Sequence, residues 1–203
     1  MDYEYDIFIS YRRIGDEWDR WTTDIFVRLL RLFLRPSGKN IKIFVDKNIE
    51  TGAHWPTHLS KALAHSRILI PVLSPDYFKS EWCRLELALM HHRAQQHSAE
   101  LILPFTILDD ECFPPEVQAL QSENIYVFAN PIMNDNTPTM FEFAEYLKKC
   151  CPRILSALEV VPKYCPDWEK LAHDQVIGLF EIKTQAQTTV PVLSLPIPTI
   201  TSP

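Results

Sequence analysis

Five short runs of apolar residues, separated by longer stretches with helical periodicity, predict the strands of one sheet. The runs cover residues 5–10, 41–45, 67–73, 101–108 and 124–128. Most of them are nearly continuous rather than alternating with polar residues, which is typical of strands that are covered on both faces. Strands of this kind belong to parallel sheets, so the pattern indicates a parallel sheet of five strands.

Between these runs, apolar residues recur three and four positions apart, as they do along the buried face of a helix. The expected helices cover residues 18–33, 55–63, 80–95, 115–120, 139–158 and 167–182. Ser80 is a suitable N-cap for the third of them. The residues that we expect on the buried faces include Trp18, Trp21, Ile25, Leu29, Leu32, Phe33, Trp82, Leu85, Leu89, Met90, Phe141, Ala144, Leu147 and Cys151.

The alternation of strand and helix predicts an α/β domain with a doubly wound sheet, because parallel strands need crossover helices. We expect the flavodoxin-like strand order 2-1-3-4-5, with helices on both faces. In such a sheet, ligands bind outside the carboxyl ends of the strands, where the strand order reverses. Three loops then converge on that point: residues 11–16, 46–55 and 74–82.

The pattern weakens after residue 158, which divides the chain into three expected parts. Residues 1–158 form the α/β domain, and residues 159–186 form a helical extension. Residues 187–203 contain four prolines, and no acidic or basic residue follows Thr188. This composition predicts a polyproline-like linker or a disordered tail. We therefore expect a fragment of a longer chain, with a sensor domain beyond residue 203.

Composition and charge exclude several classes of function. The chain has 20 Lys and Arg residues against 26 Asp and Glu residues, a net charge of −6. This balance disfavours wide contact with a nucleic acid backbone. Apolar runs fall short of the roughly 18 residues of a membrane span, and the N-terminal residues lack the basic cluster of a secretory signal. We expect a cytoplasmic protein without nucleic acid or membrane partners.

The spacing of cysteines, histidines and glycines excludes common metal and nucleotide motifs. The five cysteines contain no C-x-x-C pair, and His54 and His58 lack the acidic companion of a zinc protease motif. The four glycines are too far apart for a G-x-G-x-x-G loop or a P-loop. We therefore expect no metal site and no bound cofactor, and we expect reduced thiols.

Glu86 is the strongest candidate for a chemical role. In a helix over residues 80–95 it shares one stripe with Trp82 and Met90, which lie four positions to either side. A carboxylate on a largely apolar stripe is partly desolvated, and such groups are enriched at functional sites. From the spacing alone, an ordinary glutamate at the boundary of the core is the simpler interpretation.

Two arginines and an aspartate lie where the first two strands end. Arg12 and Arg13 follow the first strand, and guanidinium groups match the geometry of phosphate oxygens. A solvated edge is the alternative interpretation of this pair. Asp46 follows the second strand, where it suits a ribose hydroxyl or an arginine, and a cap for the turn before Gly52 explains it equally well.

Four segments of the chain resemble, in order, the conserved boxes of Toll/interleukin-1 receptor (TIR) domains. They are YDIFISYRR at residues 5–13, FVD with IETG at 44–46 and 49–52, VLSP at 72–75, and SEWCRLEL at 80–87. Each box is weak by itself, but their order and separation make the resemblance strong over residues 3–150. It implies the same flavodoxin-like fold.

Some members of that family cleave NAD at the bond between nicotinamide and ribose, whereas others only bind one another. In the catalytic members a glutamate of the third helix lies in the pattern W-x-x-x-E, which Trp82 and Glu86 match. The resemblance therefore implies that Glu86 is catalytic and that NAD is the substrate, not a cofactor. It also implies contacts with NAD from Tyr11, Arg12, Arg13, Asp46, Gly52, Trp55 and Trp82, although Trp82 also fits a place in the core.

One carboxylate suffices for this reaction, because nicotinamide is cationic in NAD and leaves as a neutral amide without protonation. Glu86 would stabilise the oxocarbenium-like ribose by its charge, and the product is linear or cyclic ADP-ribose. The resemblance also implies self-association through residues 46–55, in a head-to-tail contact that propagates as a filament or open oligomer. We expect an NAD-cleaving effector of the kind found in bacterial defence, with a noncatalytic TIR scaffold as the alternative.

Overall fold

A computed structural model of the chain describes residues 2–45, 55–107, 113 and 115–188. Its centre is a five-stranded sheet in which neighbouring strands pair in parallel, in the order β2-β1-β3-β4-β5. The strands are β1 (Tyr5–Tyr11), β2 (Ile43–Val45), β3 (Ser66–Leu73), β4 (Phe105–Thr106) and β5 (Glu123–Asn124). The predicted flavodoxin-like order is therefore confirmed.

The two longest strands, β1 and β3, form the centre of the sheet. Ile7 and Ile9 of β1 pair with Ile68 and Ile70 of β3, and all four side chains are at most 1% exposed. Their burial agrees with apolar runs that are covered on both faces of a parallel sheet. Because the strands run in parallel, their carboxyl ends leave the core at the same edge.

Strand β4 is much shorter than the predicted strand over residues 101–108. Only Phe105–Thr106 pairs as a strand, and an isolated bridge joins Ile102 to Leu69. Between the bridge and the strand lies Pro104, which has no backbone N–H to donate to a ladder. Apolar character predicted the burial of this segment but not the interruption of its pairing.

The predicted strand over residues 124–128 is largely wrong. Strand β5 ends at Asn124, and the chain then forms the 3₁₀ helix η5 (Tyr126–Phe128). The side-chain oxygen of Asn124 accepts a hydrogen bond from the Tyr126 backbone N–H at 3.0 Å. This local bond favours a turn over a continued strand.

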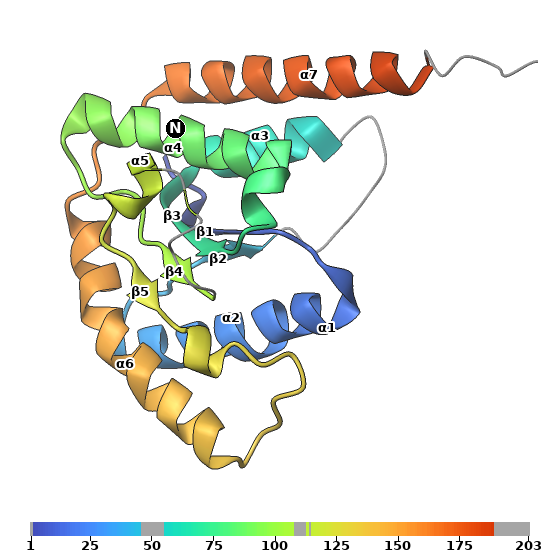
Figure 1. Cartoon of the computed structure of the whole chain (residues 1–203). Coiled ribbons are helices and arrows are strands. Elements are labelled where there is room, and N and C mark those ends of the chain that lie inside the picture. Colours follow the sequence, from blue (N-terminus) through green and yellow to red (C-terminus); the bar gives the residue numbers. More distant parts are fainter. Residues whose placement is uncertain (1, 46–54, 108–112, 114, 189–203) are drawn as a thin grey trace, which may run out of the picture.

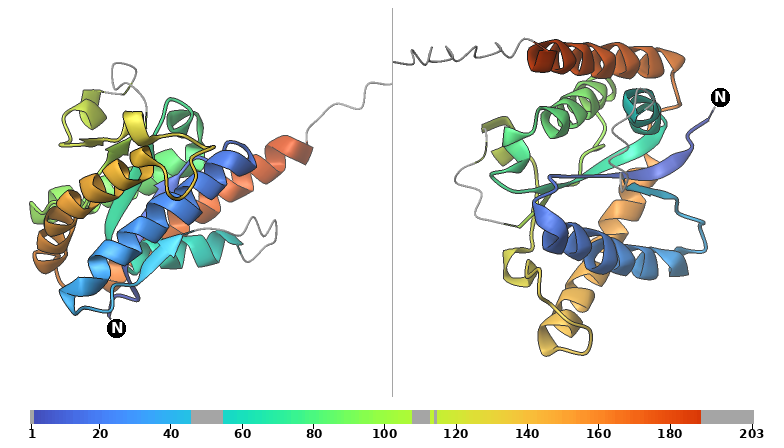
Figure 2. Two further views of the ribbon diagram at one scale, coloured as in Figure 1. Left: turned by 90° about the horizontal axis from the view of Figure 1, so that it is seen from below. Right: turned by 90° about the vertical axis from the view of Figure 1, so that its right-hand side faces the viewer.

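Helices cover both faces of the sheet (Figures 1 and 2). One face carries α1 (Gly15–Arg20), the π-helical segment η1 (Trp21–Phe26), α2 (Val27–Leu34) and α6 (Pro138–Glu159). The other face carries α3 (Trp55–Ala64), α4 (Glu81–His97) and α7 (Pro166–Thr188). Shorter elements connect them: η2 (Arg35–Ser37), η3 (Tyr77–Lys79) and α5 (Pro115–Gln118).

The helix predicted over residues 18–33 is one continuous helix, built from α1, η1 and α2. The junction residues Trp21 and Val27 keep right-handed helical backbone angles. Because a π-helical turn holds an extra residue, α2 turns a different face to the core than a regular helix would. Leu30 and Leu34 are fully buried, whereas Leu32 is 56% exposed, so the prediction of Leu32 as a core residue was wrong.

Helix α4 turns a stripe to the core that is rotated by one position from the predicted one. Its buried residues are Cys83, Glu86, Leu87, Met90 and Arg93, whereas the predicted Trp82, Leu85 and Leu89 are only partly buried. Two charged residues, Glu86 and Arg93, occupy positions of the buried stripe. The spacing of Glu86 from Trp82 and Met90 predicted its place on the stripe, whereas the pattern of hydrophobicity assigned Arg93 to the surface.

Helix α6 buries Phe143 instead of the predicted Phe141. Phe143 is 0% exposed and stacks on Trp21 and Phe128, with ring centroids 5.9 and 5.1 Å apart. Phe141 is 61% exposed. The buried stripe continues at helical spacing through Leu147 and Cys151, which are buried as predicted, and Phe141 lies off this stripe.

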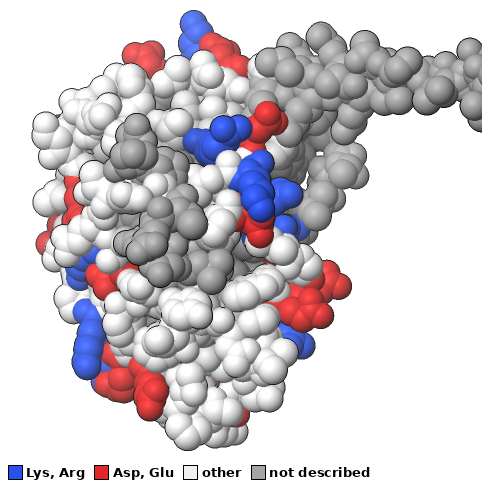
Figure 3. Space-filling view, in the orientation of Figure 1, with Lys and Arg blue, Asp and Glu red and all other residues white. Residues whose placement is uncertain are grey.

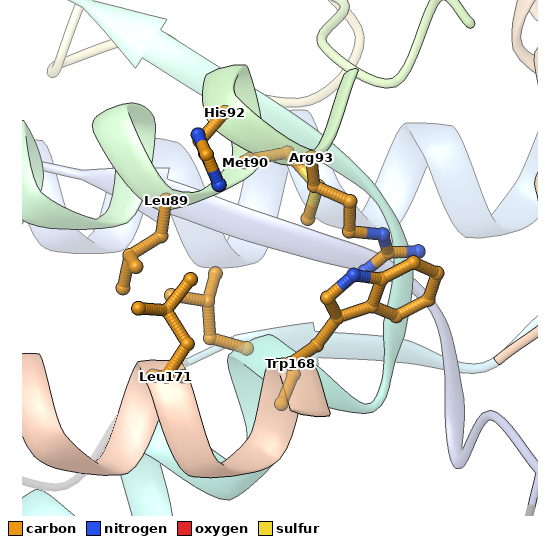
Figure 4. A pocket seen from close by; sticks show the side chains of 9 residues that line it. Leu89, Met90, His92, Arg93, Trp168 and Leu171 are labelled. Carbon is orange, nitrogen blue, oxygen red and sulfur yellow. The ribbon is translucent and has the colours of Figure 1, made fainter. Parts of the chain in front are cut away.

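Helix α7 packs across α3 and α4 on the outer side of the domain (Figures 1 and 2). Trp168, Ala172 and Val176, four positions apart, are each at most 8% exposed. Figure 4 shows Trp168 and Leu171 facing α4 across a cavity of 20 Å³. The predicted helix 167–182 is thus present, whereas the division of the chain into separate domains stays a prediction.

Charges of both signs are distributed over the surface of the described residues. On the face shown in Figure 3, Lys and Arg side chains lie among Asp and Glu side chains and form no continuous basic stripe over the residues described there. Arg28 pairs with Asp135 and Lys39 with Glu159 across different elements. In the described part of the chain, no helix combines the length and hydrophobicity that a membrane crossing requires.

Candidate functional site

A cavity of 120 Å³ lies at the carboxyl ends of β1 and β3, where the strand order reverses. Tyr11, the last residue of β1, and Arg12 line it, as do Ser74 and Asp76, which follow β3. The other lining residues are Ile14, Trp18, Thr22, Val72 and Ile107. Doubly wound sheets bind ligands at this position. The structure therefore brings two of the predicted NAD contacts, Tyr11 and Arg12, together at the expected edge.

Asp19 of α1 orients two of the residues that follow β1. The Tyr11 hydroxyl donates a hydrogen bond to the Asp19 carboxylate, and Arg13 Nε lies 3.5 Å from the same carboxylate. Burial raises the pKa of Tyr11, and the hydrogen bond to Asp19 raises it further, so this hydroxyl stays protonated. Arg13 is thus engaged by Asp19, whereas Arg12 is exposed at the rim of the cavity.

Glu86 lies on α4, which covers the opposite face of the sheet from α1, and it does not line the cavity. Ser80 caps this helix by accepting a hydrogen bond from the Cys83 backbone N–H at 3.4 Å. The Glu86 side chain is 8% exposed, and its Oε2 accepts a hydrogen bond from Ser10 Oγ at 2.5 Å. Glu86 is therefore a buried carboxylate at the carboxyl edge of the central strand, as its place on an apolar stripe predicted.

The phenol of Tyr77 and the thiol of Cys83 lie beside Glu86. Tyr77 is 0% exposed, and its hydroxyl donates to the Cys83 carbonyl at 3.0 Å. Burial raises the pKa of Tyr77 well above its ordinary value, and the charge of Glu86 adds to the rise. Burial, followed by the charge of Glu86, raises the pKa of Cys83 to about 12, and the positive charge of Arg12 opposes that rise. Both groups therefore stay neutral near the carboxylate.

Sequence reasoning missed Ser10 and Tyr77 as members of this site. Ser10 carries a weak signal, because it is a polar residue that follows the apolar run Ile7–Ile9 of β1. Tyr77 carries no periodic signal, since it lies in the short 3₁₀ helix η3. The hydroxyls of these two residues approach to 2.8 Å although 67 positions separate them in the sequence.

The structure describes only some of the other residues that were predicted to contact NAD. Trp82 is partly buried and packs against the core, and its stacking on a substrate ring stays a prediction. Trp55 begins α3, but its side chain lies outside the described part of the chain. Asp46 and Gly52 lie outside the described residues altogether. The predicted convergence of residues 46–55 with the other two loops therefore stays a prediction.

The described residues also bear on metal binding. Within 2–45, 55–107, 113 and 115–188, no group of three or more His, Cys, Asp or Glu side chains has a metal-binding arrangement. The cysteines that the structure places, Cys83, Cys150, Cys151 and Cys165, are free thiols.

Comparison with known proteins identifies the family and several relatives. The family model TIR_2, described as "TIR domain", matches residues 7–136. TMV resistance protein N of Nicotiana glutinosa is 36% identical over 86 residues, which cover 42% of this chain and 7% of that protein. NAD(+) hydrolase TirS of Staphylococcus aureus is 28% identical over 102 residues, which cover 50% of this chain and 33% of TirS.

The chain thus spans only a small part of the length of these relatives. Among solved structures, the TIR domain of the Toll-related receptor TRR-2 from Hydra magnipapillata matches with a TM-score of 0.45 and 24% identity. That match covers 60% of this chain and 85% of the Hydra chain.

Proposed function

The chain belongs to the TIR domain family, and we propose that it is an NAD+ nucleosidase that cleaves the bond between nicotinamide and ribose. The observation that carries this proposal is the buried carboxylate of Glu86, which follows Trp82 in the pattern W-x-x-x-E and accepts a hydrogen bond from Ser10. Burying a carboxylate costs free energy, so a functional role explains why a carboxylate lies at this buried position. The similarity to NAD(+) hydrolase TirS supports the same activity.

In the proposed reaction the glycosidic bond of NAD+ breaks, and its electron pair leaves with the nicotinamide ring. The leaving ring becomes neutral, so no acid is required to protonate it. Positive charge develops on the ribose, and the negative charge of Glu86 stabilises it most strongly in the transition state. Water then bonds to the ribose carbon and loses a proton, which the Glu86 carboxylate accepts before it passes to solvent. The products are ADP-ribose, nicotinamide and one proton.

A cyclic product would form if a nitrogen of the adenine attacked the ribose carbon in place of water. Which nucleophile attacks is decided by how the ligand folds in the site. Arg12, exposed at the rim of the cavity, suits the pyrophosphate, because a guanidinium donates two parallel hydrogen bonds to phosphate oxygens.

The test is NAD cleavage by Glu86→Gln, followed as released nicotinamide. Gln has nearly the same shape and still accepts the Ser10 hydrogen bond, so the fold stays intact while the stabilising charge is lost. We expect the turnover rate to fall at least about 100-fold, with circular dichroism unchanged. Glu142→Gln, an exposed change on α6, is the matched control. Wild-type turnover by folded Glu86→Gln would overturn the assignment.

A noncatalytic module that mediates contacts between TIR domains is the second candidate function. It is favoured by large apolar side chains at the surface: Val127, Ile132 and Phe141 are 70%, 72% and 61% exposed. The lower end of the molecule in Figure 3, near the start of α6, is mostly uncharged. Apolar surface of this kind suits protein contacts. A protein that releases no nicotinamide from NAD at high concentration, but self-associates, would support this candidate.

Self-association and NAD cleavage are compatible if assembly activates the enzyme. We propose that the domain serves immune or antiphage signalling as such an effector, with head-to-tail contacts through residues 46–55. Resistance proteins from plants are among the relatives, which supports a role in defence.

A further inference from the structure

The hydroxyl of Ser10 lies between the carboxylate of Glu86 and the phenol of Tyr77. Ser10 Oγ donates to Glu86 Oε2 at 2.5 Å and lies 2.8 Å from Tyr77 Oη. The three residues come from β1, α4 and η3, three elements that meet at the carboxyl edge of the sheet. The small side chain of Ser10 therefore connects the buried carboxylate to both β1 and η3.

Two hydroxyl hydrogens, one from Ser10 and one from Tyr77, serve the three contacts of this chain. Tyr77 has one hydroxyl hydrogen, which it donates to the Cys83 carbonyl at 3.0 Å and can share with Ser10 Oγ. Ser10 also has one hydroxyl hydrogen, which it donates to Glu86. An ionised carboxylate only accepts hydrogen bonds. If the Glu86 carboxylate turned away, the buried hydroxyl of Ser10 would lose its acceptor, at a cost typical of an unsatisfied buried group.

Burial makes these hydrogen bonds more effective than they would be at the surface. Ser10 is 1% exposed, Tyr77 is 0% exposed and Glu86 is 8% exposed. Bulk water therefore has little access to replace the donor when Glu86 moves. Hydrogen bonds are stronger electrostatically in such a low-dielectric region.

A second contact ties the same two elements together next to Glu86. The Cys83 thiol of α4 lies 3.6 Å from the Tyr11 carbonyl oxygen of β1, within the range of a weak S–H hydrogen bond. Ser10 and Tyr11 are consecutive, so two neighbouring residues of β1 contact α4. The position of Ser10 relative to the helix that carries Glu86 is thereby fixed.

We infer that Ser10 is the positioning residue for Glu86: anchored on Tyr77, its hydroxyl holds the carboxylate in one orientation before the substrate binds. This inference rests on the proposed NAD cleavage for its effect on rate, but not for its effect on Glu86 itself. A long, flexible glutamate side chain otherwise has to be ordered during the reaction. Orientation in advance removes that cost from the transition state.

The kinetic test compares Ser10→Ala with Ser66→Ala. Ser66 is a matched control, because it is also a fully buried serine and donates to a backbone carbonyl, that of Ala62. We expect Ser10→Ala to lower kcat for NAD at least about tenfold with KM changed less than twofold, because the carboxylate acts in the transition state. Ser66→Ala should keep the wild-type kcat. Tyr77→Phe, which removes the anchor but leaves Ser10 in place, should give a smaller loss of kcat.

A second readout does not depend on catalysis. Subtracting the infrared spectrum of Glu86→Gln from that of the wild type isolates the carboxyl band of Glu86, whose frequency reports the hydrogen bond that it accepts. The band should shift in Ser10→Ala and stay in place in Ser66→Ala. If the wild type cleaves no NAD but the band shifts, the proposed function fails while the orientation of Glu86 by Ser10 stands. An unshifted band in folded Ser10→Ala, or wild-type kcat in an active protein, would overturn the inference.

Discussion

Arg93 and Trp168 lie face to face: the guanidinium carbon of Arg93 is 4.2 Å from the centre of the Trp168 ring. The Tyr3 ring also lies close to this guanidinium, with its centre 5.1 Å from the same carbon. Arg93 also donates to the backbone carbonyls of Ser66 and Arg67, so a buried cation of α4 is held by aromatic rings and carbonyl groups. Through this contact, α7 becomes part of the packed domain.

Trp168→Ala should destabilise the domain by about 3 kcal/mol, because it removes a large buried side chain and exposes a cation that stacks on it. Urea denaturation followed by circular dichroism measures the change in the free energy of unfolding. Phe141→Ala is the control, since its exposed ring should contribute no more than about 0.5 kcal/mol. Equal stability of the Trp168 variant and the wild type would show that α7 contributes nothing to folding.

Arg12 and Arg13 should differ in their effect on NAD cleavage. Arg12→Ala removes an exposed guanidinium at the rim of the cavity and should raise KM for NAD about tenfold with little change in kcat, because phosphate binding is similar in the ground and transition states. Arg13→Ala should raise KM less, because Asp19 already engages Arg13. Steady-state kinetics of the two variants measures KM and kcat for NAD. A lower kcat without a change in KM would contradict a role of Arg12 in binding.

The contact between His65 and Glu169 should make stability depend on pH. Glu169 Oε2 lies 3.0 Å from His65 Nε2, and the hydrogen bond from His65 lowers the pKa of Glu169 below its ordinary value of 4.5. The folded state therefore binds this proton less readily than the unfolded state. The resulting stabilisation is present above pH 4.5 and is lost as the pH falls through the folded pKa.

The experiment compares the free energy of unfolding of the wild type and Glu169→Gln from pH 7 to pH 3. The difference should be small, because Glu169 is 39% exposed and solvent screens the contact. It should also vanish at the acidic end of the range. A difference that persists undiminished at pH 3 would assign the effect to packing instead of charge.

The described cysteines should react with iodoacetamide in a defined order. Burial raises the pKa of Cys83 and Cys150 to about 12 and that of Cys151 to about 11. The thiolate is the reactive form, so these three thiols should be labelled very slowly at pH 8. Cys165 is partly exposed and should be labelled first, as measured by mass spectrometry of the native protein. Early labelling of Cys83 would show that α4 opens away from β1.

The proposed assembly predicts that specific activity rises with protein concentration. A loop that docks against a neighbouring copy would complete the site only in an oligomer, and heterologous contacts propagate into open assemblies. Trp55→Ala, in the segment proposed to dock, should reduce both assembly and turnover, whereas Glu86→Gln should reduce turnover only. Light scattering and nicotinamide release across a hundredfold dilution series measure the two effects. Constant specific activity with a monomer throughout would contradict this mechanism.

The sequence was sufficient to predict the sheet, because the isoleucines of β1 and β3 form continuous apolar runs with helical segments between them. It did not distinguish Phe143 from Phe141 in α6, because both are aromatic and lie two positions apart. The amino-acid composition likewise did not predict the extra residue in η1, which moves Leu32 to the surface. Periodicity identifies an element, whereas packing decides which of its faces is buried.

The site was predictable only where a residue type is unusual for its position. Glu86 stood out as a charged residue on an apolar stripe, and the arginines stood out by following a strand. Ser10 and Tyr77 meet through tertiary structure alone: Ser10 carries only a weak signal in its strand, and Tyr77 carries none. Arg93 was missed for a related reason, because the rings that make its burial possible come from both ends of the chain.

The π-helical segment Trp21–Phe26 places one extra residue between α1, which carries Trp18 of the cavity wall, and α2, which packs into the core. An α-helix turns by about 100° per residue, so deleting one residue from this segment would rotate Gly15–Arg20 by about that angle relative to α2. Trp18 would then leave the wall of the cavity. Against a relative whose helix is regular throughout, a correct alignment therefore needs a one-residue gap between residues 21 and 26. Without that gap, every position before it would be matched to a residue that faces a different direction.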